Sequence, residues 1–182
     1  MEQAKKSNPA PLGLLGFGMT TILLNLHNAG LFEVSIMIAA MGFALGGLAQ
    51  IIAGVLEFKA GNTFGGTAFT AYGLFWWSLV LIWWNPMSLH DANSMSMGFY
   101  LSVWALFTAF MFIGALKHNN ITKIVFGTLT VLFIALAIAF FTEVNAILVT
   151  AGVIGIICGL CAFYSAVAQI VNGEYGRKVF PT

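Results

Sequence analysis

Long apolar runs, separated by short polar breaks, make up most of the chain. Within each run the apolar positions are nearly continuous and do not alternate with polar ones, which favours helices over strands. A helix needs about 20 residues to cross a hydrocarbon core of about 30 Å. We therefore predict six membrane-spanning helices, at residues 10–29, 33–57, 63–84, 95–116, 121–141 and 145–171.

The breaks between these runs consist of turn-forming residues. They read NAG at 28–30, KAGN at 59–62, NPMS at 85–88 and KHNN at 117–120, and the sixth run begins near TEVN at 142–145. Asn, Gly and Pro favour turns. Since no break has room for a soluble unit, we predict one six-span transmembrane domain over residues 1–182.

Composition supports a membrane environment. Apolar residues make up 60% of the chain and charged residues only 7%, and the mean hydropathy is +0.95. In lipid every backbone polar group must be satisfied within the protein, which leaves helical bundles and closed barrels. Because the runs do not alternate, the predicted fold is an all-α integral membrane bundle.

The basic residues fall on one side of this six-span arrangement. The positive-inside rule then places both termini in the cytoplasm. The breaks on the opposite side carry His27, Glu33, His90, Asp91 and Glu143 but no Lys or Arg. The seven basic residues are Lys5, Lys6, Lys59, Lys117, Lys123, Arg177 and Lys178.

No Lys, Arg, Asp or Glu lies near the centre of a predicted span. Glu33 and Glu57 are at opposite ends of the second span, and we expect both to reach the membrane interface. This pattern argues against a voltage sensor, a carboxylate-ligated metal site and a buried guanidinium. The polar groups inside the spans are neutral, and either of two roles fits them: helix–helix contact, which suits any single Thr, or a polar pathway built by the set.

Glycines at GxxxG spacing occur at the start of the third predicted span and within the sixth. They are Gly61 with Gly65 and Gly155 with Gly159, and this spacing lets two helix backbones approach closely. We expect most of these glycines to lie at contacts between helices or subunits.

Cys158 and Cys161 form a CxxC pair, a spacing that also occurs in redox and metal sites. No histidine or further cysteine accompanies them, so we expect two small packing residues. The three histidines share no metal-binding spacing, and no nucleophile with its base is recognisable. We therefore expect no enzyme activity, no metal, no cofactor and no nucleic-acid partner.

The start of the first run carries a longer motif. Residues 8–14 read NPAPLGL, and GFGMTTILLNLHN at 16–28, GNTFG at 61–65, TAFTAYG at 67–73, LTVLF at 129–133 and NGEYGRKVFP at 172–181 follow. In these motifs the chain closely resembles the acetate uptake transporter family over nearly its whole length.

The resemblance implies a six-helix protomer that assembles as a homohexamer in the lipid of the bacterial inner membrane. Each protomer would carry its own path for acetate, succinate or other short carboxylates. The family's constriction is formed by an aromatic of the first span, a Tyr of the third and a Leu of the fifth, which correspond here to Phe17, Tyr72 and Leu129. Family members are described both as proton-coupled carriers and as anion channels, and the sequence does not decide between them.

The NPAP segment is the expected entry for the carboxylate. Pro9 and Pro11 can begin a helix abruptly, and Asn8 is a favoured N-cap residue. Free amides and the positive end of the helix dipole would then face the cytoplasm and receive an anion. Local physics alone favours a plain helix start, whereas the resemblance favours carboxylate entry. The predicted substrate-binding residues are Asn8, Pro9, Pro11, Thr20, Asn25, Thr67 and Thr70.

Two other functions fit an apolar bundle without internal charge. One is a channel for ammonia or another small neutral solute, and the other is a membrane assembly subunit that transports nothing. A solute-uptake panel in proteoliposomes separates all three hypotheses.

Overall fold

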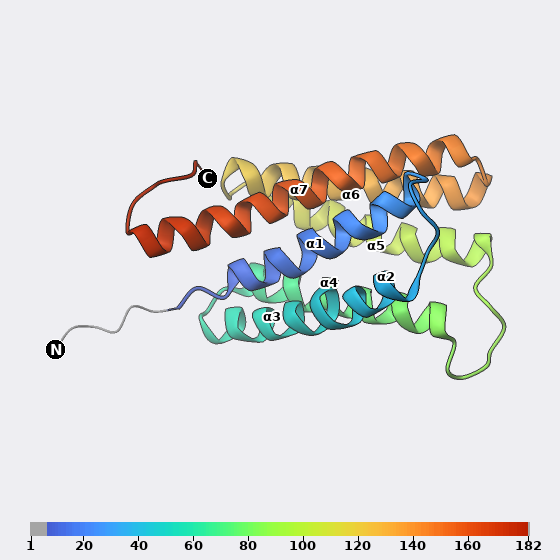
Figure 1. Ribbon diagram of the computed structural model, residues 1–182, viewed down its shortest axis with the longest axis horizontal. Coiled ribbons are helices and arrows are strands. Elements are labelled where there is room, and N and C mark those ends of the chain that lie inside the picture. Colours follow the sequence, from blue (N-terminus) through green and yellow to red (C-terminus); the bar gives the residue numbers. More distant parts are fainter. Residues whose placement is uncertain (1–6, 182) are drawn as a thin grey trace.

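The computed structural model describes residues 7–181, which form helices joined by short turns and contain no strand. Six helical segments of this range are long and apolar enough to cross a membrane, which confirms the predicted all-α fold (Figure 1). The second segment contains a stretch of π-helix, η1. The elements are α1 (Ala10–Asn28), α2 (Ile36–Met41), η1 (Gly42–Ala49), α3 (Gln50–Lys59), α4 (Thr63–Trp84), α5 (Ser94–Ala115), α6 (Asn120–Thr142) and α7 (Asn145–Tyr175).

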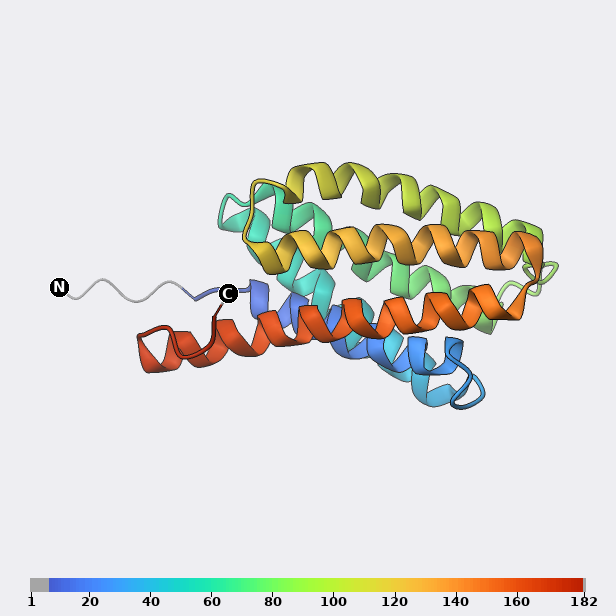
Figure 2. The same cartoon turned by 90° about the horizontal axis from the view of Figure 1, so that it is seen from above.

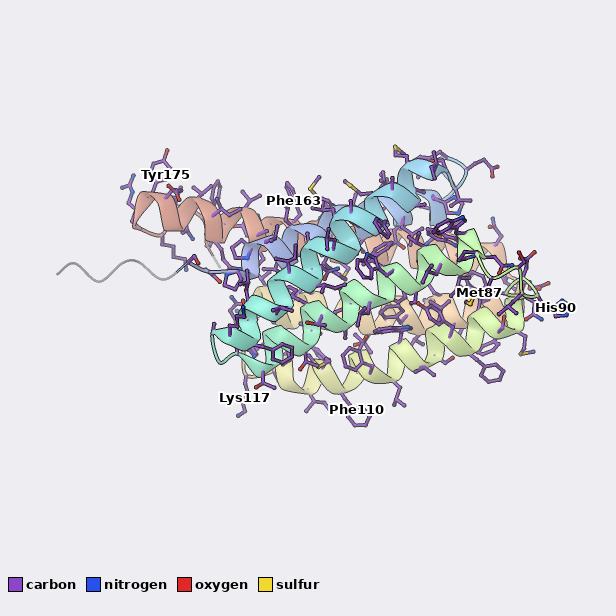
Figure 3. The ribbon with its side chains drawn as sticks, turned by 90° about the horizontal axis from the view of Figure 1, so that it is seen from below. Met87, His90, Phe110, Lys117, Phe163 and Tyr175 are labelled. Carbon is purple, nitrogen blue, oxygen red and sulfur yellow. The ribbon has the colours of Figure 1, made fainter. Side chains whose placement is uncertain are left out.

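The helices run roughly along one common direction, and α1 packs between α7 and the α2–η1–α3 segment (Figures 1 and 2). α4 packs on α3 and η1, and α5 pairs with α6, which in turn packs on α7. Large apolar side chains such as Phe110, which is 66% exposed, point away from the bundle (Figure 3). These exposed side chains suit contact with lipid.

Charge divides the bundle into two ends. Lys117 and Tyr175 lie at one end, whereas Met87 and His90 lie at the other (Figure 3). The first end also holds the start of α1, the turn after Lys59 and the end of α7. We call it the basic end, and we call the end with Asp91 and Glu143 the acidic end. The predicted segregation of charge therefore appears in the fold, except that Lys5 and Lys6 lie outside the described residues.

Glycines bring α1 and α7 into backbone contact. A Cβ added at Gly18 would lie 2.7 Å from the amide nitrogen of Phe163, and one at Gly159 would lie 2.8 Å from the carbonyl oxygen of Gly18. A Cβ at Gly155 would overlap the side chain of Asn25. The prediction that Gly155 and Gly159 lie at a helix contact is therefore confirmed.

The expectation of a contact holds for Gly65, where an added Cβ would lie 3.2 Å from Oε2 of Glu57 on α3, and is wrong for Gly61, where it would meet nothing within 4 Å. Gly61 lies in the turn before α4 with φ of +82°, so only Gly65 of the pair is helical. The left-handed φ explains the glycine at position 61, since other residues adopt this region at a cost.

The expectation for Glu57 is also wrong. Its side chain is only 4% exposed, and its Oε2 accepts a hydrogen bond of 2.7 Å from Nδ2 of Asn62. Asn62 is the N-cap of α4, where its Oδ1 accepts from the N–H of Gly65 at 3.0 Å. Glu57 thus stays inside at the start of a helix, where a carboxylate is favoured by the dipole. Glu33, by contrast, lies in the loop before α2, because the second helix begins at Ile36.

We expect Gly18→Ala to lower the free energy of unfolding by about 1–3 kcal/mol, the usual cost of overpacking. The added methyl group would meet backbone atoms of α7, which cannot rotate away. Thermal unfolding of the purified protein in detergent measures the effect. Gly173→Ala is the matched control, because a Cβ there meets nothing within 4 Å. Equal stability of the two variants would contradict the proposed backbone contact.

Candidate functional site

Three side chains from three helices meet in the centre of the bundle. Phe17 of α1, Tyr72 of α4 and Leu129 of α6 are 6%, 4% and 3% exposed. The ring centroids of Phe17 and Tyr72 are 6.0 Å apart. We call these three residues the collar, and the structure brings them together as the resemblance implies.

The collar separates two small cavities, each of about 30 Å³. One water molecule occupies about the same volume in liquid water. Neither cavity can therefore hold a carboxylate together with its hydration shell. All three collar residues line both cavities. The basic-side cavity is also lined by Leu14, Gln50, Ala68, Phe69, Val125 and Phe126. The acidic-side cavity is also lined by Thr21, Leu24, Asn25, Phe75, Trp76, Leu132, Phe133 and Leu136.

The Tyr72 side chain is held from α5. Its hydroxyl donates to Oγ1 of Thr108 at 3.0 Å, and Thr108 donates in turn to the carbonyl of Trp104 at 2.7 Å. The ring of Phe107 packs on Tyr72 with centroids 5.6 Å apart. The Tyr72 hydroxyl therefore donates its proton to a residue of α5. Thr108 was missed by the site prediction, since a single Thr in an apolar span gives no signal of its partner.

Asn25 is one predicted site residue that does line a cavity. It is 2% exposed, and its Nδ2 donates to the carbonyl of Thr21 at 2.8 Å. Its Oδ1 accepts from Nδ2 of Asn28 at 3.1 Å. Asn25 and Thr21 thus place an amide and a hydroxyl in the lining of the acidic-side cavity, and Thr21 was not predicted.

The predicted Thr residues lie elsewhere. Thr20, Thr67 and Thr70 line neither of the two cavities. Thr20 is fully buried with its methyl group against Gly46 of η1, and Oγ1 of Thr70 lies over Gly54 of α3. For Thr20 and Thr70 the structure thus shows the helix-contact alternative.

The NPAP segment differs from the prediction in its hydrogen bonds. α1 begins at Ala10 with Pro9 as its N-cap. Oδ1 of Asn8 accepts from the N–H of Ala10 at 3.1 Å, and the N–H of Leu12 donates to the carbonyl of Pro9 at 3.1 Å. Pro11 has no N–H. The N–H groups of Ala10 and Leu12 therefore have acceptors within the segment, so fewer amides face the basic end than the sequence suggests.

Asn8 instead links two helices. Its Nδ2 donates to Oε1 of Gln169 on α7 at 3.0 Å, and Nε2 of Gln169 donates to Oγ of Ser165 at 3.3 Å. Asn8 is exposed, Pro9 is half-buried and Pro11 is buried. The contact fixes the start of α1 relative to α7.

Gln50 lies beside the collar and was not predicted as a site residue. Its side chain is fully buried and lines the basic-side cavity. Nε2 donates to the carbonyl of Gly46 at 2.7 Å, whereas Oε1 has no partner among the described residues. A buried acceptor without a partner is costly. The sequence signal that could have identified it is a glutamine within an otherwise apolar run.

The two cysteines are free thiols. Cys158 is fully buried and its Sγ donates to the carbonyl of Val125 at 3.4 Å, while Cys161 is half-buried. Among residues 7–181 no three His, Cys, Asp or Glu side chains gather where they could hold a metal ion. Cys158 therefore packs α7 against α6.

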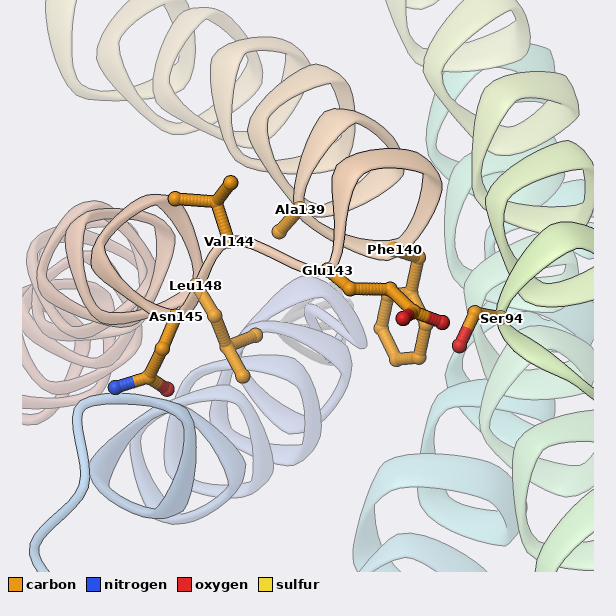
Figure 4. A pocket seen from close by; sticks show the side chains of 7 residues that line it. All are labelled: Ser94, Ala139, Phe140, Glu143, Val144, Asn145 and Leu148. Atoms are coloured by element: carbon orange, nitrogen blue, oxygen red, sulfur yellow. The ribbon is translucent and has the colours of Figure 1, made fainter.

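A separate hollow lies at the acidic end, between the α6–α7 turn and the start of α5 (Figure 4). Its volume is about 260 Å³, and Glu143 points across it toward Ser94. Glu143 ends α6 in the left-handed conformation, with φ of +55°. Because the one ionisable group here is acidic, this hollow is a poor site for an organic anion.

Comparison with known proteins shows similarity over the full chain. The model of the GPR1/FUN34/yaaH family matches residues 1–180. The "Succinate-acetate/proton symporter SatP" of Escherichia coli K12 is 54% identical over 183 residues, which cover 100% of this chain and 97% of that protein. The solved "Structure of the bacterial acetate channel SatP" superposes with a TM-score of 0.94 at 54% identity, covering 97% of this chain and 99% of that one. The "Ammonia transport outward protein 2" of Saccharomyces cerevisiae is 39% identical over 93% of this chain and 64% of its own length.

We expect a double-mutant cycle between Tyr72→Phe and Thr108→Val to give a coupling of about 1 kcal/mol in the free energy of unfolding, the contribution of one buried hydrogen bond. Thr108→Val should cost more than Tyr72→Phe, because it leaves the Tyr72 hydroxyl without a partner. Unfolding in detergent measures each variant. Thr130→Val is the control, since its hydroxyl bonds only within α6. No coupling with Thr108→Val would contradict the bond.

Proposed function

The chain belongs to the GPR1/FUN34/yaaH family, and from this membership we propose that it is a membrane permease for acetate and related short carboxylates such as succinate. The relatives named above are transporters or channels. Transport of the solute, without any enzymatic step, metal or cofactor, is the proposed activity.

The observation that carries the proposal is the collar. Phe17, Tyr72 and Leu129 lie between two cavities on the long axis of the bundle, and each lines both. A constriction of two aromatic rings and one Leu side chain favours a small solute with a methyl group and excludes hydrated ions. Since each cavity is only about 30 Å³, the side chains of the collar must move when substrate passes.

In this proposal the NPAP segment acts by fixing the position of α1. The segment holds α1 through the bond between Asn8 and Gln169, and α1 carries Phe17. Pro9 and Pro11 fix the start of the helix. Asn8 is exposed at the basic end, so its side chain is accessible to a carboxylate there. Asn25 is the proposed polar contact on the acidic side, and Thr20, Thr67 and Thr70 support the helix contacts around the path.

An anion channel and a proton-coupled carrier differ in the form of the substrate that crosses: the carboxylate in the first, the carboxylate together with a proton in the second. A carboxylate without a basic partner is costly to transfer from water into an apolar site, and no Lys or Arg lines either cavity. We therefore propose that the proton travels with the substrate, as undissociated acid. This mode agrees with the name of the E. coli relative, a proton symporter.

Ammonia export is a second candidate, because the yeast relative is named for it. A neutral solute suits the same apolar collar. Uptake of labelled acetate by proteoliposomes that do not transport methylammonium would exclude this candidate, and the reverse result would exclude the carboxylate permease.

We further propose a homohexamer in the bacterial inner membrane with both termini in the cytoplasm. The charge segregation supports the orientation. An apolar groove of about 790 Å³ between α2 and the end of α4, lined by Val34, Ile36, Phe43, Trp83 and Trp84 among others, offers a surface that lipid or a neighbouring copy must cover.

We expect Phe17→Ala and Leu129→Ala to raise succinate uptake relative to acetate by about tenfold, the scale of selectivity that an apolar pocket provides by fit. Removing either side chain widens the collar. Uptake of labelled acetate and succinate by proteoliposomes measures the ratio. Leu101→Ala is the matched control, since Leu101 is 3% exposed in α5 and lines neither cavity. An unchanged ratio in both collar variants would rule out the collar as the selectivity element.

We expect a membrane-impermeant maleimide to label His90→Cys on intact cells and to label Lys178→Cys only after lysis. Both positions are exposed: His90 lies at the acidic end (Figure 3), and Lys178 follows α7, which ends at the basic end. Replacement of Cys158 and Cys161 by Ala removes the native thiols. The opposite labelling pattern would reverse the proposed orientation.

A further inference from the structure

The side chain of Gln50 places a buried amide beside the collar, where it could bind a ligand. It is fully buried, and it lines the basic-side cavity together with Phe17, Tyr72 and Leu129. The other side chains of that cavity are apolar. A polar group placed there meets whatever passes the collar.

The orientation of this amide is fixed by its hydrogen bond. The carbonyl of Gly46 can only accept, so the nitrogen of the amide must be the atom that faces it at 2.7 Å. The free end of the amide is therefore the acceptor, Oε1, which has no partner among the described residues.

Two other buried oxygens in this range have no partner, but they differ in kind. The hydroxyls of Thr20 and Thr70 can rotate, and a Thr hydroxyl in a helix readily donates to a carbonyl of the preceding turn. The amide oxygen of Gln50 cannot donate at all. It requires a donor from outside its own helix.

This requirement separates the two forms of a carboxylic acid. The undissociated acid carries one O–H donor, whereas the carboxylate carries acceptors only. An anion beside Oε1 would face a second electron-rich oxygen in an apolar cavity and lose its hydration. The protonated form satisfies Oε1 and carries no net charge.

No ionised group near this cavity offsets that preference. Of the residues lining it, the one titratable side chain is Tyr72 of α4, whose hydroxyl donates to Thr108. The lining residues from α1 and α6 are apolar. On the element of Gln50 itself, Glu57 lies two turns toward the basic end, about 10 Å along the helix, and is bonded to Asn62. Lys59 on the same element is exposed.

We propose that Gln50 is a specificity-determining residue of the transport path, and that its Oε1 accepts a hydrogen bond from the O–H of an undissociated carboxylic acid on the basic side of the collar. This inference rests on the proposed function, and it names the form of the substrate that the path selects.

Competition in proteoliposomes tests the proposal without altering the protein. Acetamide is a neutral solute of nearly the same shape as acetic acid and carries N–H donors, whereas acetone has the same shape without a donor. We expect acetamide to inhibit uptake of labelled acetate and acetone not to inhibit it. Equal inhibition by both, or by neither, would overturn the proposal.

Two variants extend the test. Gln50→Leu removes the acceptor, so we expect acetate uptake to fall about tenfold, the loss of one hydrogen bond to a neutral partner, together with the loss of inhibition by acetamide. In Gln50→Glu the protonated side chain can donate to Gly46 and present its carbonyl oxygen. We therefore expect its uptake to approach that of the unaltered protein at low pH and to fall more steeply as pH rises.

Thr150→Val is the control, because its exposed hydroxyl bonds only to the carbonyl of Ala146 within α7. Gel filtration of each purified variant establishes that it is folded. Unaltered uptake and unaltered pH dependence in both Gln50 variants would show that Oε1 meets only water, which overturns the inference and leaves the carboxylate permease intact. Absence of any acetate uptake by the unaltered protein would overturn both.

Discussion

The position of α1 depends on two close backbone contacts that flank Phe17. A Cβ at Gly16 would lie 2.5 Å from the carbonyl oxygen of Leu45, and a Cβ at Gly18 would lie 2.7 Å from the amide nitrogen of Phe163. α1 is therefore held between η1 on one side and α7 on the other, at distances that only glycine permits. The residue between the two glycines is the collar aromatic. Its placement in the centre of the bundle follows from contacts made by its neighbours.

The interior polar groups obey the rule that polar atoms in an apolar medium need partners. Several Thr and Ser hydroxyls in the spans donate to carbonyls of their own helix, as Thr128, Thr130 and Thr150 do. The Tyr72–Thr108–Trp104 chain joins α4 to α5, and the Glu57–Asn62 pair joins α3 to α4. These bonds fix helix positions without placing a charge on the path. The amide oxygen of Gln50 departs from this rule beside the collar.

The number of spans and the charge segregation were predictable from the sequence, because hydropathy and the positions of Lys and Arg respond directly to the bilayer. The contact of Gly155 and Gly159 was predictable as well, since it depends only on small size at helical spacing. Pairings between distant segments were not. The burial of Glu57 depends on Asn62 across a turn, and the bonding of the Ala10 amide depends on how the side chain of Asn8 folds back. The collar was identified through family resemblance, since three apolar residues far apart in the chain give no local signal.

The closed collar has a consequence for proton leakage across the membrane. Each cavity holds about one water molecule's volume, and two aromatic rings with a Leu side chain lie between them. A file of water molecules through the bundle would have to pass these three side chains, which line both cavities. In the proposed permease, a collar closed in this way would limit proton leakage between transport events, so that many copies in one membrane would draw little on the proton gradient.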